Sequence, residues 1–220
     1  MLYVCATPIG NLEDITLRVI RALSEVDIVF AEDTRHTLKL LNHLEIKTKL
    51  CSYHRHNCAQ RDEYAISLLK EGKNVALVSD AGMPAISDPG VQLIKRCIEN
   101  SLEFTILPGA TAFVTALVAS GLPTDNFTFI GFLPVKSGKR KKMLNNLQLL
   151  PHTLIFYESP HRVTKMLTDA KEVLGDRNCV AARELTKKFE EVLRGKISEL
   201  LIHFSSHPPR GEFVILIEGA

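Results

Sequence analysis

A short segment in the first half of the chain, Ala31–Thr37 (AEDTRHT), carries four side chains that could transfer a proton or hold an anion. Glu32 and Asp33 are adjacent carboxylates, and Arg35 and His36 follow within three residues. A carboxylate or imidazole within hydrogen-bond reach of a substrate hydroxyl acts as a general base. Asp33 is also a good N-cap residue, which would place both cations in a first helical turn, where the helix dipole disfavours them. The segment is therefore a ligand site or a solvated turn.

Two further loops are rich in small and turn-forming residues. Val78–Gly90 (VSDAGMPAISDPG) follows an apolar run and holds two aspartates, two glycines and two prolines, and Leu107–Ala112 (LPGATA) follows another. Small residues let a ligand approach the backbone closely. We expect helices to begin near Ser87 and Thr111, where free N–H groups suit a carboxylate. Together the loops predict a pocket of backbone amides and carbonyls suited to a zwitterion or an adenosine moiety.

The most basic part of the chain lies in its second half. Residues 1–120 have 12 Lys and Arg against 14 Asp and Glu, whereas residues 121–220 have 15 against 11. Five of the seven residues Lys136–Lys142 are basic. They crowd into an expected first helical turn, where the dipole disfavours cations. The run favours contact with RNA or another polyanion, and the alternative is a solvated helix start.

The elements that must position these loops alternate along the first half. Apolar segments at 2–6, 27–33, 48–53, 74–79 and 102–109 read as strands, with helical patterns between them. Apolar strands without alternation are typical of a parallel sheet covered on both faces. In such sheets ligands bind at the carboxyl ends of the strands, which is where the special residues stand.

A second series of elements begins after a Gly-Pro break at residues 120–125. Strand-like segments at 127–134, 152–158, 178–186 and 211–219 alternate with helical segments at 139–150, 159–175 and 196–204. The sequence therefore predicts an α/β fold of two domains, 1–121 and 122–220, with a cleft between them. The first sheet is expected to be mostly parallel and the second mixed.

Several classes of protein are excluded by what the sequence lacks. It has no G-x-G-x-x-G and no P-loop motif. Its five cysteines form no C-x-x-C pair, and the spacing around His54 and His56 matches no standard zinc module, so we expect no metal. An apolar strand begins almost at the first residue and no apolar run reaches the roughly 18 residues of a membrane span. A cytoplasmic protein without membrane contact is expected.

Seven motifs together resemble one family. They are TPIGNLEDITLR, AEDTRHT, VSDAGMPAISDPG, LPGATAFVTALVASGLP, GFLPVKSGKRK, TLIFYESPHR and ARELTKKFEE. In order and spacing, from Leu2 to about Gly219, they resemble the bacterial 16S ribosomal RNA cytidine 2′-O-ribose methyltransferases of the tetrapyrrole methylase superfamily. Members of that family continue past GEFVILIEG into a small helical segment, whereas this sequence ends at Ala220.

The resemblance implies an enzyme that uses S-adenosylmethionine as methyl donor, acts on 16S RNA or the small ribosomal subunit, and forms a homodimer. The implied donor-binding residues are Pro8, Ile9, Asp80, Ala81, Gly82, Met83, Ile86, Ser87, Gly109, Ala110, Thr111, Leu133, Tyr157, Ala182 and Phe213. The expected RNA-binding residues are Lys136, Lys139, Arg140, Lys141, Lys142 and Arg162. The candidates for a catalytic role are Glu32, Asp33, Arg35 and His36, because their strand-end loop faces the same edge as the donor pocket.

Two other functions remain open at this point. A tetrapyrrole (precorrin-type) C-methyltransferase would share the fold and the donor, but a macrocycle with acidic side arms needs fewer cations than the basic run supplies. A non-catalytic RNA-binding protein would have no use for the two small-residue loops, which are intact.

Overall fold

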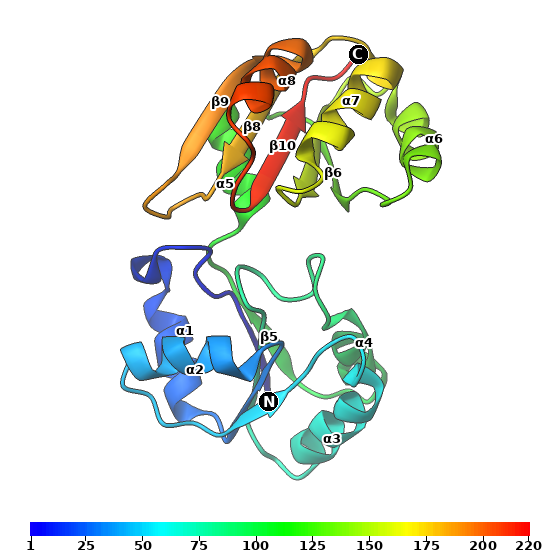
Figure 1. The fold of residues 1–220 in the computed structure, drawn as a ribbon. Coiled ribbons are helices and arrows are strands. Elements are labelled where there is room, and N and C mark those ends of the chain that lie inside the picture. Colours follow the sequence, from blue (N-terminus) through cyan, green and yellow to red (C-terminus); the bar gives the residue numbers. More distant parts are fainter. The chain divides into compact units, whose positions relative to one another are not determined.

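The computed structural model describes all 220 residues, which divide into two compact units, Met1–Thr111 and Ala112–Ala220 (Figure 1). The sequence placed the boundary after residue 121, at the Gly-Pro break. Helix α5 (Ala112–Ser120) precedes that break but packs on the sheet of the second unit. Arg194 of that sheet donates from Nε to the carbonyl of Ser120 at 3.1 Å. The units therefore divide one helix earlier, because these non-local contacts fix α5 to the second sheet.

The first unit is built around a five-stranded sheet. Its strands are β1 (Leu2–Cys5), β2 (Ile28–Ala31), β3 (Leu50–Ser52), β4 (Val75–Val78) and β5 (Phe104–Leu107). Its helices are the 3-10 turn η1 (Leu12–Asp14), α1 (Leu17–Glu25), α2 (Thr34–His43), α3 (Cys58–Lys70) and α4 (Val91–Glu99). The sheet order is β3-β2-β4-β1-β5 and every pair is parallel, which confirms the expected parallel sheet.

Both faces of this sheet are buried, which explains the unbroken apolar strands. Alternate strand residues such as Val4 and Leu77 join a core with α3 and α4, and their neighbours Cys5 and Ala76 join a second core with α1 and α2. Because all five strands run the same way, their carboxyl ends meet at one edge of the sheet. The loops that carry the candidate functional residues therefore gather there.

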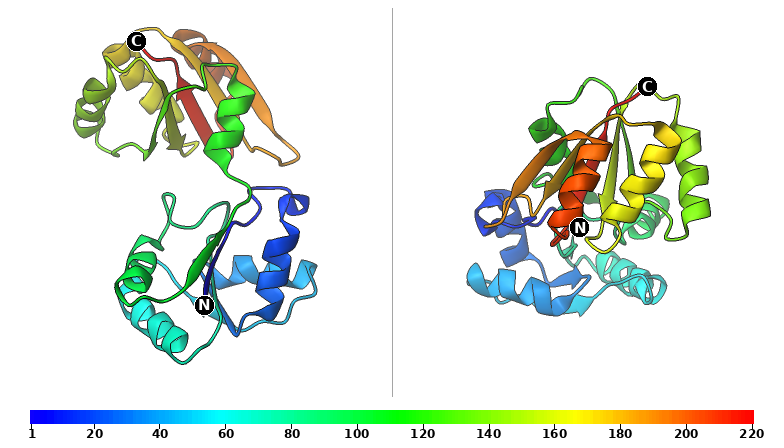
Figure 2. Two further views of the ribbon diagram at one scale, coloured as in Figure 1. Left: turned by 180° about the vertical axis from the view of Figure 1, so that it is seen from behind. Right: turned by 45° about the horizontal axis from the view of Figure 1, so that its top comes forward.

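The second unit also has five strands but a mixed sheet. Its strands are β6 (Phe127–Phe132), β7 (Thr153–Glu158), β8 (Asn178–Arg183), β9 (Glu191–Lys196) and β10 (Phe213–Ile217), in the order β6-β7-β10-β8-β9. Only β6 and β7 pair in parallel, so the expectation of a mixed sheet is confirmed. Helices α6 (Ser137–Leu147), α7 (Val163–Leu174) and α8 (Ile197–Ser206) cover one face, and α5 covers the other (Figure 2). No helix of either unit is long and apolar enough to cross a membrane.

Strand β9 was missed in the sequence. It pairs antiparallel with all of β8, from Asn178 opposite Lys196 to Arg183 opposite Glu191. Its six residues, EVLRGK, include three charged side chains and a glycine, a composition that is depleted in strands. Pairing with a distant segment therefore stabilises it, and local preference does not predict it.

A buried ion pair joins α6 to α7 and overturns one expectation from the sequence. Arg140, expected on an RNA-binding surface, is only 4% exposed. Its guanidinium reaches the carboxylate of Asp169 at 2.6 Å and donates to the carbonyl of Val135 at 3.0 Å. Ser137 Oγ donates to the same carboxylate at 2.9 Å. Arg140 therefore stabilises the fold and is not available to a phosphate.

We expect Arg140→Met to lower the free energy of unfolding by about 3 kcal/mol, because it leaves the Asp169 carboxylate buried without its main cation. Urea denaturation measures this. The double variant Arg140→Met, Asp169→Leu should recover most of the loss, since neither charge is then stranded. Lys139→Met, at the exposed neighbouring position, is the control and should change stability by less than about 0.5 kcal/mol. An equal loss in the control and in Arg140→Met would show that the ion pair contributes nothing.

Candidate active site

Backbone hydrogen bonds join two strand-end loops at the carboxyl edge of the first sheet. Thr7 N donates to Gly82 O at 2.9 Å, and Gly82 N donates to Thr7 O at 3.0 Å. Thr7 Oγ1 also donates to the carbonyl of Ser79 at 3.1 Å, and Ser79 Oγ to that of Gly82 at 3.2 Å. Both hydroxyl side chains are buried. The loop after β4 is therefore fixed to the loop after β1, by two residues that the sequence reading did not select.

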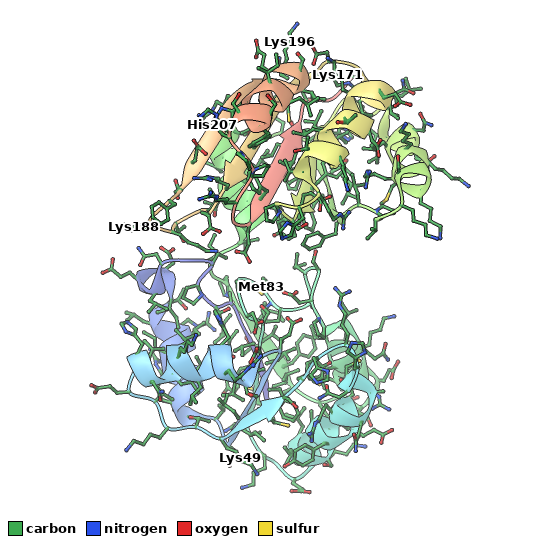
Figure 3. The ribbon with its side chains drawn as sticks, in the orientation of Figure 1. Lys49, Met83, Lys171, Lys188, Lys196 and His207 are labelled. Atoms are coloured by element: carbon green, nitrogen blue, oxygen red, sulfur yellow. The ribbon has the colours of Figure 1, made fainter.

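A third loop closes on the same place. Gly82 has φ of +81°, and a Cβ there would lie 3.3 Å from Ile9 Cγ2 and 3.5 Å from the carbonyl of Ala110. A Cβ on Gly109 would lie 2.8 Å from that of Ala6. The three loops thus pack closely at these two glycines, and Met83 follows Gly82 in the chain (Figure 3). Among the first-unit residues assigned to the donor, the structure brings Ile9, Gly82 and Ala110 together, and Pro8, Ala81, Gly109 and Thr111 adjoin them in the chain.

The middle of the loop after β4 has an unusual backbone. Ala85 and Ser87 have φ of +70° and +68°, which only glycine adopts without strain. Strain of this kind is common where a backbone is shaped for a ligand. Arg55 Nη2 donates to the carbonyl of Ser87 at 2.6 Å and holds this turn. The expectation that Ser87 opens a helix is wrong, because α4 begins at Val91 after Gly90, whose φ is +139°.

Three carboxylates cluster at this edge. Burial, and then the charge of Asp80, raise the pKa of Glu32 above its usual value. Burial, and then the charge of Glu32, raise the pKa of Asp88 to about 6. Asp80 Oδ1 accepts from the backbone N–H of Asp33 at 2.9 Å, which links this loop to the one after β2. The cluster holds a proton at mildly acidic pH, and Asp88 is a member that the sequence reading missed although it lies in the glycine-rich loop.

The side chains of the other three catalytic candidates are engaged elsewhere or exposed. Asp33 caps α2, as expected, and also accepts two hydrogen bonds from the guanidinium of Arg35, at 2.6 and 3.0 Å. The hydrogen bonds from Arg35 hold the pKa of Asp33 well below its usual range. Arg35 and His36 are exposed on the first helical turn. The ion pair with Asp33 therefore explains why Arg35 stands in the first turn, and no ligand is needed to explain it. Of the four candidates, Glu32 is the best placed to act as a base.

The second-unit residues assigned to the donor lie at one end of the mixed sheet but on two faces. Tyr157 and Ala182 both pair opposite Val214, so they share a face. Leu133 and Phe213 are buried in the core beneath α6, α7 and α8. Their side chains therefore pack the core.

The basic residues divide into paired and unpaired groups. Lys141 Nζ lies 2.6 Å from Glu172, and Arg162 pairs with the buried Glu158 at 3.1 Å. Arg162 also donates to the carbonyl of Leu133 at 2.5 Å, so it supports the chain around β6. The exposed cations without an ion pair in this segment are Lys136, Lys139 and Lys142.

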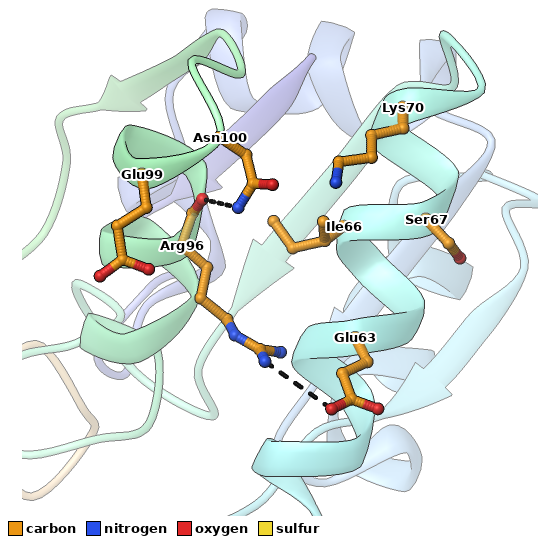
Figure 4. A pocket seen from close by; sticks show the side chains of 7 residues that line it. All are labelled: Glu63, Ile66, Ser67, Lys70, Arg96, Glu99 and Asn100. Atoms are coloured by element: carbon orange, nitrogen blue, oxygen red, sulfur yellow. Dashed lines mark hydrogen bonds and ion pairs between the residues drawn. The ribbon is translucent and has the colours of Figure 1, made fainter.

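A groove between α3 and α4 is separate from these loops (Figure 4). It is lined by Glu63, Ile66, Ser67, Lys70, Arg96, Glu99 and Asn100. Lys70 and Asn100 stand at the carboxyl ends of their helices, hence toward the amino ends of the parallel strands. The groove therefore lies away from the edge that carries the carboxylates.

Comparison with known proteins places the chain among methylases. Residues 1–201 match the family model described as Tetrapyrrole (Corrin/Porphyrin) Methylases. A protein of Halalkalibacterium halodurans named Ribosomal RNA small subunit methyltransferase I is 52% identical over 99% of this chain and 75% of its own length. A protein of Thermotoga maritima with the same name is 45% identical over 99% of this chain and 98% of its own.

Solved structures share the fold at low sequence identity. The cobalt precorrin-4 methyltransferase CbiF has a TM-score of 0.72 at 19% identity, over 99% of this chain and 94% of its own. The methyltransferase CobJ has a TM-score of 0.73 at 20% identity, over 100% of this chain and 94% of its own. At this identity the likeness establishes the two-unit α/β fold.

We expect Asp88→Asn to stabilise the chain at neutral pH. Because folding raises the pKa of Asp88 from 3.8 to about 6, the folded chain binds more protons in that window, and the free energy of unfolding falls as the pH rises through it. The variant should match the wild type near pH 4 and exceed it above pH 6 by roughly 1–2 kcal/mol, after a discount for solvent screening.

Urea denaturation between pH 4 and 8 measures the difference. Asp14→Asn, at an exposed carboxylate of η1, is the control and should differ by less than about 0.5 kcal/mol at every pH. A gap between Asp88→Asn and the wild type that did not grow with pH would contradict the assignment of a raised pKa.

Proposed function

The chain belongs to the tetrapyrrole (corrin/porphyrin) methylase family, and on that premise we propose that it transfers a methyl group from S-adenosylmethionine to the ribose 2′-hydroxyl of a cytidine in 16S ribosomal RNA. The observation that carries the proposal is the 45–52% identity, over nearly the whole chain, to proteins named Ribosomal RNA small subunit methyltransferase I. The resemblance also implies a homodimer, which we include in the proposal.

The three joined loops of the first unit support a binding site for the donor. Gly82 and Gly109 let the three loops close on one another, because neither position has a side chain that would hold them apart. Small residues and turn amides dominate the surrounding loops, which suits a zwitterion with an adenosine moiety. We propose that Pro8, Ile9, Asp80–Met83 and Gly109–Thr111 hold the donor, and that Ile86 and Ser87 contact it from the held turn.

RNA is favoured over a tetrapyrrole as the acceptor. The solved tetrapyrrole methyltransferases are only 19–20% identical, which supports the fold alone. Lys136, Lys139 and Lys142 are exposed and unpaired, and phosphate groups are the natural counterions of such a series.

The chemistry requires little beyond orientation and a proton acceptor. S-adenosylmethionine supplies an activated methyl group on its sulfonium. The chain must hold the attacking ribose oxygen in line with that methyl group. Correct orientation alone greatly accelerates the transfer. We propose Glu32 as the base that accepts the hydroxyl proton, with a contribution of roughly 10²–10⁴-fold. Burial and the charge of Asp80 raise the pKa of Glu32, which makes it a stronger base than an exposed carboxylate.

Transfer of a labelled methyl group tests the substrate. We expect label in small ribosomal subunits or in naked 16S RNA, recovered as 2′-O-methylcytidine after digestion and mass spectrometry. A tetrapyrrole precursor should remain unlabelled. Label in the tetrapyrrole alone would establish the C-methyltransferase instead, and binding of RNA without any transfer would point to a non-catalytic RNA-binding protein.

We expect Gly82→Val to abolish binding of S-adenosylmethionine in calorimetry, because the new side chain fills the space between Ile9 and Ala110. Gly72→Val is a matched control, since Gly72 has the same φ of +81° but nothing within 4 Å of an added Cβ. Both variants should lose about 1–2 kcal/mol of stability to backbone strain, and the control should keep its donor affinity. Equal donor affinity in the two variants would remove the glycine loop from the proposed site.

A further inference from the structure

An irregularity in edge strand β6 exposes an aromatic ring. Phe129 pairs with Ile155 of β7, but the next pair joins Gly131 to Phe156, so Ile130 is an extra residue. This is a β-bulge, and Gly131 has φ of +72°. Regular alternation would turn Phe132 toward the core under α6 and α7, on the side where Ile130 packs. The bulge instead puts Phe132 opposite Tyr157, on the face covered by α5, where it is 54% exposed.

The ring of Phe132 is the exposed end of an aromatic row. Its centroid lies 5.7 Å from that of Tyr157, which lies 5.0 Å from Phe129. Phe129 stacks on Phe113 of α5 at 4.4 Å with an interplanar angle of 21°. The row limits the freedom of the outermost ring, so little conformational entropy is lost when another flat group covers it.

The chain that follows this ring is basic. Lys136 lies four residues along, so its Cα is within about 14 Å of that of Phe132. Lys139 and Lys142 follow, and the segment from 132 to 142 contains no acidic residue. The three lysines make no ion pair, whereas Arg140, Lys141 and Arg162 are all engaged within the fold. β6 is an edge strand, so no further strand pairs with it on the side away from β7.

An exposed ring beside unpaired lysines fits one class of partner. Single-stranded RNA offers an unstacked base to the ring and phosphates to the cations, and base–aromatic stacking contributes roughly 1–3 kcal/mol per base. A duplex hides its bases within the stack, and an apolar protein surface would leave the lysines without partners. Resting on the proposed function, we propose that Phe132 is a stacking platform for an unpaired base of the RNA substrate, with Lys136, Lys139 and Lys142 on adjacent phosphates.

The first test measures the ring. We expect Phe132→Ala to weaken binding of a single-stranded oligocytidine RNA of about twelve nucleotides by about 5- to 100-fold in fluorescence anisotropy. Phe132→Trp should retain or exceed wild-type affinity, and Phe132→Leu should behave like the alanine variant, because leucine keeps an apolar side chain but offers no π face. Leu149→Ala is the matched control, since Leu149 is an apolar side chain that is 86% exposed just after α6.

The second test separates stacking from charge. Replacing Lys136, Lys139 and Lys142 with glutamine should reduce the slope of log affinity against log salt by about 2, whereas Phe132→Ala should leave the slope unchanged. The same variants are measured on small ribosomal subunits and on an RNA duplex of equal length. For the duplex, we expect no effect of Phe132→Ala.

Three outcomes would overturn the inference. In the first, Phe132→Ala binds both single-stranded RNA and subunits as tightly as the wild type. In the second, Phe132→Ala loses equal affinity for the duplex and the single strand. In the third, Phe132→Leu binds single-stranded RNA with full wild-type affinity. Dissociation of a dimer by Phe132→Ala in sedimentation would mean that a second copy of the chain covers the ring. Donor binding and methyl transfer by the wild type report separately on the proposed function, so stacking can fail while that function stands.

Discussion

The pair of backbone hydrogen bonds between Thr7 and Gly82 is the constraint on which the candidate site depends. Strands β1 and β4 are parallel, yet these two residues bridge in the antiparallel sense, so the chain after β4 must reverse at once. Only a residue that adopts φ of +81° without strain and leaves room for Ile9 and Ala110 permits this reversal. The buried hydroxyl of Thr7 donates to the carbonyl of Ser79, and the hydroxyl of Ser79 adds a second hydrogen bond to the carbonyl of Gly82. These hydrogen bonds and close contacts consequently hold the three loops together.

The charged groups near this wall and those of the second unit play different physical roles. In the first unit, burial and mutual repulsion keep Glu32 and Asp88 poised to hold a proton, while Arg55 offsets part of the repulsion and fixes the turn at Ser87. In the second unit, Arg140 and Arg162 form ion pairs with carboxylates of the same unit and donate hydrogen bonds to its carbonyls. The basic run of the sequence therefore divides in two. Arg140 and Lys141 pair with carboxylates of the fold, whereas Lys136, Lys139 and Lys142 face solvent.

Local sequence patterns predicted the elements well where burial alone selects them. Apolar runs such as those of β1 and β4 specify strands covered on both faces, and Asp33 is the N-cap that predicted the start of α2. The patterns failed where a distant segment decides the outcome. Strand β9 exists because β8 pairs with it, and α4 begins at Val91, later than expected, because the preceding residues are held in a strained turn by Arg55.

The candidate site divides in the same way. The sequence by itself determined the two α/β units, the position of the glycine-rich loops at the carboxyl ends of parallel strands, and the family. Hydrophobic periodicity and motifs can be read directly along the chain. Tertiary structure alone decided which members of each loop meet. It brought Glu32 near enough to Asp88 for their charges to interact, and it left Arg35 and His36 exposed. It also buried Arg140 and turned Phe132 outward through a bulge. These outcomes depend on distances between residues far apart in the chain, and burial, pKa and ion pairing follow from those distances.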